Sequence, residues 1–251
     1  MPSYNDIKRH LKKHALNKES KLSQIPSLKV IARIHTDFPT KFGIPRQSGL
    51  IDTLKAVIVF EKEYRNMDAF RGLEGFDYIW IIWGFSEAIR EKWSPMVKPP
   101  RLGGNTRMGV FATRSPFRPN PLGLSSVKLD RIEEYPDLGP ILHVSGADLM
   151  DNTPIFDIKP YLPYTDSHPD AKSGFAESKP YERLEVDFPE QWLGMIPEDR
   201  REAIIGILSL DPRPSYQKDR DRIYGVEFAG YDIRFTVHDN HLSVCEVVML
   251  E

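Results

Sequence analysis

Alternating apolar and polar positions predict several β-strands in the first two thirds of the chain. Residues 30–34 alternate cleanly, and the apolar runs at 54–60 and 141–144 are typical of short strands. Residues 78–85 (YIWIIWGF) are apolar throughout, which predicts a strand that is buried on both faces. Residues 63–76 follow neither period, and we expect them to be helical or irregular.

The stretch 99–129 predicts a strand, a stiff turn and a second strand. Residues 108–112 and 124–129 are apolar and strand-like, and prolines at 116, 119 and 121 separate them. Proline fixes φ and donates no backbone hydrogen bond, so this turn holds Arg114 and Arg118 at one strand end. Planar guanidinium groups suit a carboxylate or phosphate. The competing interpretation is that both arginines are ordinary solvated surface.

A change of pattern divides the chain after residue 163. Residues 164–180 are polar and contain Pro and Gly, which is typical of a domain boundary. Beyond them Pro197 begins a helix whose buried stripe comprises Ala203, Ile204, Ile207 and Leu208. Alternating strands follow at 224–228, 231–237 and 242–250, with a hairpin turn at Asp239-Asn240.

These patterns predict a mainly β protein with two domains. We expect a basic N-terminal arm over residues 1–22, an antiparallel β-barrel domain over 23–165, and a small α+β domain over 166–251. The prediction for the arm rests on six lysines and arginines against two acids; a solvated or frayed segment is the simpler interpretation. No alternation of strands and helices supports a Rossmann fold.

Composition and motifs exclude several kinds of functional site. The 251 residues carry a net charge of −2 and a single cysteine, Cys245, so an internal disulfide and a cysteine-rich metal site are excluded. His238 and His241 have a metal-like spacing, but their place in a hairpin turn favours exposed turn residues, and we expect no metal. The single cysteine favours a cytoplasmic protein. We expect no membrane partner, because no stretch approaches the length of an apolar span. Neither a P-loop nor a dinucleotide-binding fingerprint is present.

Charge is distributed unevenly along the chain. Residues 92–128 contain seven lysines or arginines and no acidic residue, although the whole chain is slightly acidic. A surface of one sign concentrates anions, and Gly103 with Gly104 permits close backbone approach. The sequence therefore predicts a nucleotide or nucleic-acid site in this segment.

Five motifs in order resemble the TsaA-like, or TrmO, family of tRNA methyltransferases over nearly all of residues 28–250. They are IPRQ at 44–47, RGLEGF at 71–76, PPRLGGNTRMGVFATRSPFRPNPLGLS at 99–125, DLMDNTPIFDIKPYLPY at 148–164 and DPRPSY at 211–216. The resemblance implies a non-Rossmann β-barrel that binds S-adenosylmethionine and acts as a homodimer. It also implies methylation of the N6 nitrogen of threonylcarbamoyladenosine beside the anticodon of tRNA.

The resemblance also implies which residues bind the cofactor: Pro45, Arg46, Gln47, Ser86, Glu87, Arg114, Leu124, Asp148, Leu149, Met150 and Asp151. Gln47 and backbone near Asp148 suit the adenine edge, and Arg46 or Arg114 suits the methionine carboxylate. Asp148 or Asp151 suits the ribose hydroxyls. Ser86 and Glu87 equally fit solvent-facing residues after a buried strand, and Leu124 equally fits a core residue.

The tRNA is expected to contact basic and aromatic side chains: Arg101, Arg107, Arg118, Arg213 and Tyr216. No residue is assigned as a catalytic base; Asp151 is a candidate, with sugar binding an equal alternative. Two other functions stay open: a non-catalytic barrel that binds S-adenosylmethionine or RNA, and a methyltransferase with a different acceptor.

Overall fold

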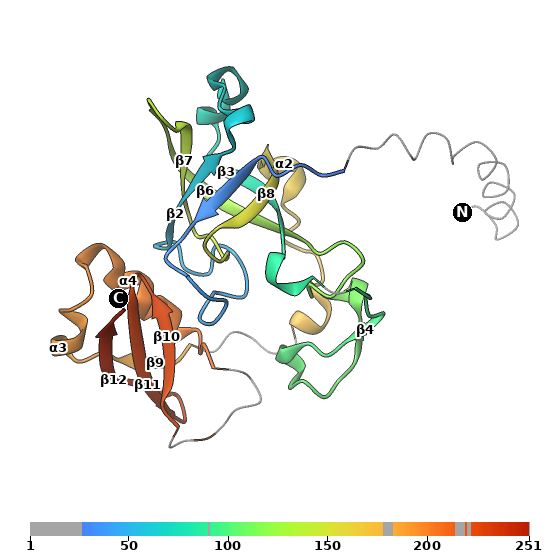
Figure 1. Cartoon of the computed structure of the whole chain (residues 1–251). Coiled ribbons are helices and arrows are strands. Elements are labelled where there is room, and N and C mark those ends of the chain that lie inside the picture. The colour runs from blue at the N-terminus through green and yellow to red at the C-terminus, as the bar shows by residue number, and fades with distance from the viewer. Residues whose placement is uncertain (1–26, 90, 178–182, 214–218, 220–221, 251) are drawn as a thin grey trace, which may run out of the picture.

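The computed structural model describes residues 27–89, 91–177, 183–213, 219 and 222–250 (Figure 1). The predicted basic arm over residues 1–22 lies outside them. The described chain forms a closed barrel, a separate four-stranded sheet and a small two-stranded ribbon. The prediction of a mainly β protein with an antiparallel barrel is confirmed.

Six strands close the barrel in the order β1-β2-β7-β6-β3-β8. They are β1 (Ala32–His35), β2 (Lys55–Phe60), β3 (Tyr78–Gly84), β6 (Leu122–Tyr135), β7 (Gly139–Ser145) and β8 (Thr153–Pro160). Each neighbouring pair is antiparallel, and β1 pairs with β8 to complete the ring. Closure leaves no free strand edge, which removes a common route to aggregation.

Period-two alternation fills the barrel interior with branched and aromatic side chains. Ile34, Ile58, Ile81 and Leu142 are fully buried there. The prediction that β3 is buried on both faces is wrong: Tyr78 is exposed, and the next alternate residues along β3 are only partly buried. The uniform apolar run concealed the alternation, because the outward positions of β3 also carry large apolar residues.

Three long connections meet at one end of the barrel, and this follows from strand direction. Residues 36–54 join β1 to β2, residues 85–121 join β3 to β6, and residues 146–152 join β7 to β8. The register places the end of β1 beside the start of β8, and the end of β3 beside the start of β6. We call this end of the barrel the rim. The segment between β2 and β3 lies at the opposite end (Figure 1).

The connection 85–121 carries a two-stranded ribbon formed by β4 (Met96–Val97) and β5 (Met108–Gly109). The predicted strand at 108–112 is therefore wrong beyond Gly109. Val110–Ala112 forms a 3-10 turn, because the Val110 amide donates to the Pro95 carbonyl and the Thr113 amide donates to the Val110 carbonyl. Other 3-10 turns are Lys62–Tyr64, Met67–Phe70, Leu73–Gly75, Ser86–Ala88, Pro100–Leu102 and Gly174–Ala176.

The C-terminal unit is a sheet in the order β10-β11-β12-β9 covered by helices. Its elements are β9 (Glu185–Asp187), α3 (Glu190–Leu193), α4 (Glu198–Ser209), β10 (Tyr224–Phe228), β11 (Tyr231–His238) and β12 (His241–Met249), and the short α2 (Pro163–Asp166) precedes them. The predicted apolar stripe of α4 is buried against this sheet. The longest described helix, α4, has 12 residues, and none of the described helices is long and apolar enough to cross a membrane.

The core of the C-terminal unit also contains residues from the rim. Phe38, Ile51 and Leu54, all from the connection between β1 and β2, pack within it. Gly43 has φ +87°, and a Cβ on it would lie 2.2 Å from Val226 of β10. The connection is thus packed tightly against the C-terminal sheet. The domain boundaries drawn at residues 23, 165 and 166 stay a prediction.

Candidate functional site

The connection between β1 and β2 brings residues 45–47 to the rim and is anchored on two sides. On the barrel side, the Gly49 amide donates to the Gly146 carbonyl at 2.9 Å. On the C-terminal side, Arg200 Nε of α4 lies 2.6 Å from Asp37 Oδ2, and the Ala229 amide donates to the Asp37 carbonyl. Burial is the main cause that raises the pKa of Asp37, and Arg200 opposes it. A loop with both sides anchored positions its side chains with little freedom.

Arg114 and Gln47, which are 67 residues apart, meet at this rim. Arg114 Nη1 donates to Gln47 Oε1, and Gln47 Nε2 donates to the Arg46 carbonyl. Pro45 is buried beneath them, and the Arg46 side chain is exposed. The fork of Arg114 keeps donors that its contact with Gln47 does not use, and these suit an anionic oxygen.

Asp148 supplies a carboxylate to the same rim. Ser125 Oγ donates to Asp148 Oδ1 at 2.6 Å and accepts from Trp83 Nε1 at 3.0 Å. Burial raises the pKa of Asp148, while Ser125, the charge of Arg114 and the Ser48 backbone lower it. The Trp83–Ser125 pair therefore fixes the orientation of a carboxylate that burial penalises when it is ionised.

The sequence analysis missed Trp83 and Ser125 as members of the site. Trp83 lies in an apolar run and was interpreted as core. Ser125 could have been identified from the sequence, because an inward-facing position of a barrel strand seldom carries a hydroxyl without a hydrogen-bond partner. Gly123 completes the arrangement, since the indole of Trp83 lies where a Cβ on residue 123 would be.

Replacing Asp148 with asparagine is expected to raise the free energy of unfolding near pH 7. Because burial raises the pKa of Asp148, the folded state binds its proton more tightly than the unfolded state. The ionised carboxylate of Asp148 destabilises the folded protein fully at pH values above the raised pKa. This destabilisation vanishes at pH values below the ordinary carboxyl pKa. Urea unfolding from pH 7 to about pH 4 measures it, and the advantage of the variant should shrink as pH falls. An equal difference at all these pH values would contradict the assignment.

Asp151 has a different environment from Asp148. Its Oδ1 accepts from the Thr36 amide at 3.1 Å and lies 3.2 Å from His35 Nδ1. The Thr36 hydroxyl in turn donates to the Leu149 carbonyl at 3.1 Å. These contacts tie the start of the connection 36–54 to the connection 146–152. Asp151 thus links the two connections through Oδ1, and its part in cofactor binding or as a base stays a prediction.

Two other predicted residues of this segment contribute mainly through the backbone. The side chain of Leu149 is 1% exposed and belongs to the barrel core. The Met150 carbonyl accepts from Thr153 Oγ1 at 2.6 Å and closes the turn before β8. Asp148 therefore differs from Leu149 and Met150, because its side chain is a carboxylate and lies close enough to Arg114 to feel its charge.

Ser86, Glu87 and Leu124 lie at the rim but apart from the Gln47–Arg114–Asp148 group. Ser86 and Glu87 form a 3-10 turn after β3, and Ser86 lines a hollow of about 290 Å³. Leu124 is 57% exposed on the outer face of β6. Among the described residues, no hydrogen bond or ion pair joins these three side chains to Gln47, Arg114 or Asp148. Their part in cofactor binding stays a prediction.

The predicted RNA contacts divide into two sets. Arg101, Arg107 and Arg118 lie in the connection 85–121 at the rim; Arg107 is exposed, and Arg118 Nη1 donates to the Thr113 carbonyl at 3.4 Å. Arg213 lies in the C-terminal unit, where it forms a bidentate ion pair with Asp211 at 2.7 and 2.9 Å. Because its charge is already paired and largely buried, we leave Arg213 out of the surface proposed below. Tyr216 lies outside the described residues.

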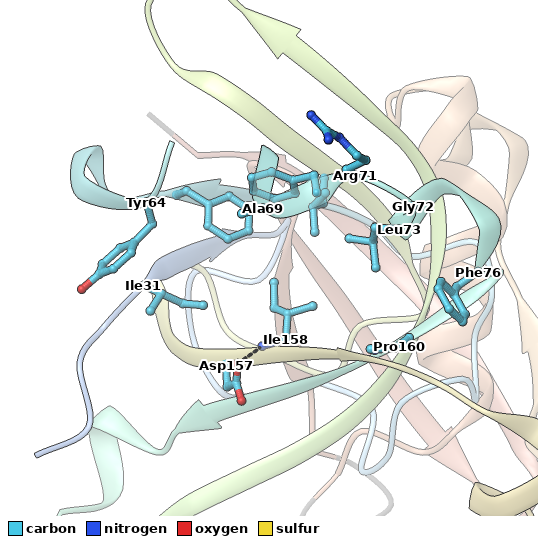
Figure 2. Close-up of a pocket in the computed structure, with 13 residues that line it drawn as sticks. Ile31, Tyr64, Ala69, Arg71, Gly72, Leu73, Phe76, Asp157, Ile158 and Pro160 are labelled. Atoms are coloured by element: carbon cyan, nitrogen blue, oxygen red, sulfur yellow. Dashed lines mark hydrogen bonds between the residues drawn. The ribbon is translucent and has the colours of Figure 1, made fainter. Parts of the chain in front are cut away.

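A larger cavity lies at the opposite end of the barrel (Figure 2). It has a volume of about 550 Å³, and Phe60, Phe70, Leu73 and Ile158 are among its lining residues. Phe60 and Phe70 pack edge to face there with ring centroids 4.7 Å apart. None of the predicted site residues lines this cavity. The polar and charged groups of the candidate site gather at the rim instead.

The fold and the rim together define a class: a six-stranded antiparallel β-barrel protein, unrelated in architecture to Rossmann proteins, whose rim brings together a guanidinium, an amide and a buried carboxylate. The chain belongs to the tRNA-methyltransferase O family. The family model of the N-terminal domain matches residues 33–167, and that of the TrmO C-terminal domain matches residues 181–250. The resemblance found in the sequence motifs is confirmed.

Curated relatives and a solved structure agree with this membership. The chain is 40% identical over 222 residues to the tRNA (adenine(37)-N6)-methyltransferase of Escherichia coli strain K12, covering 85% of this chain and 94% of that protein. It is 45% identical over 175 residues to the protein of the same name from Eikenella corrodens, covering 69% and 97%. The crystal structure of TrmO from Pseudomonas aeruginosa matches with a TM-score of 0.72 and 30% identity, covering 90% of this chain and all of that chain.

Proposed function

We propose that the protein methylates the N6 nitrogen of adenine 37 in tRNA, with S-adenosylmethionine as the methyl donor. One observation carries the proposal: three connections distant in sequence bring Gln47, Arg114 and Asp148 together at one end of the barrel. The names of the relatives support the reaction and the acceptor. We further propose threonylcarbamoyladenosine as the acceptor nucleoside, a finer assignment that rests on the family resemblance.

The donor set at the rim fits S-adenosylmethionine. Arg114, held by Gln47, offers a cation for the amino-acid carboxylate, and the amide of Gln47 is of the kind that reads an adenine edge. Asp148 offers a carboxylate for ribose hydroxyls or for the ammonium group. When bound, this cofactor supplies an electrophilic methyl group next to a positively charged sulfur.

Positioning is the main contribution that the protein makes to such a transfer. Holding nucleophile and methyl carbon at attack distance contributes on the order of 7–11 kcal/mol to lowering the barrier. The N6 nitrogen loses its proton as the new N–C bond forms, so a base close to it assists. We assign no residue as that base, because the carboxylate of Asp148 is assigned to the cofactor. Asp151, whose Oδ1 accepts from the Thr36 amide and lies beside His35, stays a candidate.

Nucleoside mass spectrometry tests the proposed function. tRNA from cells that lack this gene is incubated with the purified protein and S-adenosylmethionine, then digested. We expect threonylcarbamoyladenosine to gain one methyl group, and tRNA without the threonylcarbamoyl group to react poorly. Methylation only of adenine 37 without the threonylcarbamoyl group would refute threonylcarbamoyladenosine as the acceptor. No methylation of tRNA despite cofactor binding would support a binding module or a different acceptor.

Replacing Arg118 with alanine is expected to weaken tRNA binding and to flatten its salt dependence. A phosphate contact that is lost reduces the slope of log affinity against log salt by about 1. Filter binding at several salt concentrations measures the slope, with cofactor affinity unchanged. Arg131→Ala is the matched control, because Arg131 lies on β6 away from the rim and contacts Glu133. A slope equal to that of the wild type in the Arg118 variant would defeat the assignment.

The homodimer and the cytoplasmic location belong to this proposal as well. Exposed apolar side chains on the outer face of β3 and β6, including Tyr78 and Leu124, support self-association. A tRNA acceptor supports the cytoplasm as the compartment. Light scattering of the purified chain is expected to give twice the mass of one chain, and the mass of a single chain would refute the dimer.

A further inference from the structure

Two aromatic side chains beside the rim are presented to solvent. Trp93 is 49% exposed and Phe111 is 73% exposed, and their rings are stacked with an interplanar angle of 25° and centroids 6.1 Å apart. Phe111 lies in the 3-10 turn that follows β5, and Trp93 precedes β4. Because β4 and β5 pair with each other, the ribbon holds the two rings together.

The position of Trp93 and Phe111 offers a reason for their exposure. Large aromatic residues bury more apolar surface than any others, and their exposure together marks a contact site. The turn that carries Phe111 runs directly into Arg114, whose side chain contacts Gln47. The stacked pair is therefore joined to the candidate site by only two intervening residues of chain.

The surrounding charge indicates the chemistry of the partner. Residues 92–128 contain no acidic residue, and they include Arg107, Arg114 and Arg118. Among the described residues, none of these three guanidinium groups forms an ion pair. A stacked aromatic surface beside guanidinium groups suits single-stranded nucleic acid, because bases stack on the rings and phosphates pair with the cations.

We propose that Phe111 and Trp93 form a stacking surface for an unpaired base of the anticodon loop next to the methylated adenine. The inference rests on the proposed function and adds the residues that hold the loop. A second copy of this chain fits the surface less well, because a symmetric contact through it would bring Arg107, Arg114 and Arg118 of one copy towards the same cations of the other. An exposed base extends the stack without that repulsion.

Three variants separate stacking from other roles of the aromatic ring. Phe111→Leu keeps apolar volume and removes the ring face, whereas Phe111→Tyr keeps the face. Tyr164→Ala is the matched control, since Tyr164 is a highly exposed aromatic residue in α2, which follows the far end of β8. Each protein is titrated with a fluorescently labelled anticodon stem–loop RNA at several salt concentrations. S-adenosylmethionine affinity and mass by light scattering are measured in parallel.

We expect Phe111→Leu to bind the stem–loop about tenfold more weakly, with Phe111→Tyr and Tyr164→Ala close to the wild type. The salt slope, the cofactor affinity and the mass should be unchanged, because no charge has been removed. Wild-type affinity in Phe111→Leu, equal losses in the leucine and tyrosine variants, or a changed mass would overturn this inference alone. Failure of the wild type to bind any tRNA would instead overturn the proposed function, and this inference with it.

Discussion

Replacing Arg114 with alanine is expected to lower kcat/KM for methyl transfer by at least about 100-fold, equivalent to about 2.7 kcal/mol. The guanidinium of Arg114 contacts Gln47, and its charge reaches Asp148. Its loss removes the proposed carboxylate clamp and releases Gln47. A charge-assisted hydrogen bond alone contributes about 1.5–3 kcal/mol, and misplacing the substrate adds to that. Initial rates with radiolabelled S-adenosylmethionine and tRNA measure the effect.

Two further arginine variants make this test specific. Arg114→Lys keeps the charge but not the planar fork, so its rate should lie between those of the wild type and the alanine variant. Arg71→Ala removes an exposed arginine at the opposite end of the barrel, where Arg71 contacts Asp68, and should leave the rate unchanged. A rate within threefold of the wild type in Arg114→Ala would remove Arg114 from the site.

Replacing Gly123 with alanine is expected to lower the free energy of unfolding by about 3 kcal/mol. A Cβ at this position would lie 2.2 Å from the indole of Trp83, a buried ring that a closed barrel prevents from moving freely. Displacement of the indole also breaks its hydrogen bond to Ser125 and so disturbs Asp148. Urea unfolding, followed by circular dichroism, measures the loss.

Gly75→Ala is the matched control for that substitution. A Cβ on Gly75 meets no other atom within 4 Å, and its backbone does not require positive φ. We therefore expect Gly75→Ala to change stability by less than about 0.5 kcal/mol. Equal effects of the two substitutions would show that close packing against Trp83 does not limit residue 123.

The strands of the C-terminal unit were largely predictable from alternation alone. Tyr224, Val226 and Phe228 are buried as predicted, and the hairpin turn falls at Asp239-Asn240. Strand β9 was missed because three residues are too few to show a period, and its pairing with β12 is parallel and non-local. The strand pattern also predicted a barrel, but the order of strands around it could not be predicted, since alternation does not reveal which strands pair.

The sequence predicted which residues meet at the rim better than it predicted what each of them contacts there. The motifs that contain Gln47, Arg114 and Asp148 were singled out from the sequence, and the structure places these residues close together. The sequence left Asp151 as a candidate for the base or for sugar binding, and the structure adds that its Oδ1 accepts from the Thr36 amide and lies beside His35. Adjacent acidic residues in a turn look equivalent in a sequence, and only the packing of the rim distinguishes them.

The central claim is that S-adenosylmethionine binds at the rim and not in the larger cavity at the other end of the barrel. Calorimetric titration of S-adenosylmethionine into the wild type, Asp148→Asn and Ala69→Trp tests it directly. Ala69 is an exposed residue that lines the far cavity, so a tryptophan there obstructs it. We predict that Ala69→Trp binds like the wild type and that Asp148→Asn loses most of its affinity. Undiminished binding by Asp148→Asn together with lost binding by Ala69→Trp would contradict the account and place the cofactor in the far cavity.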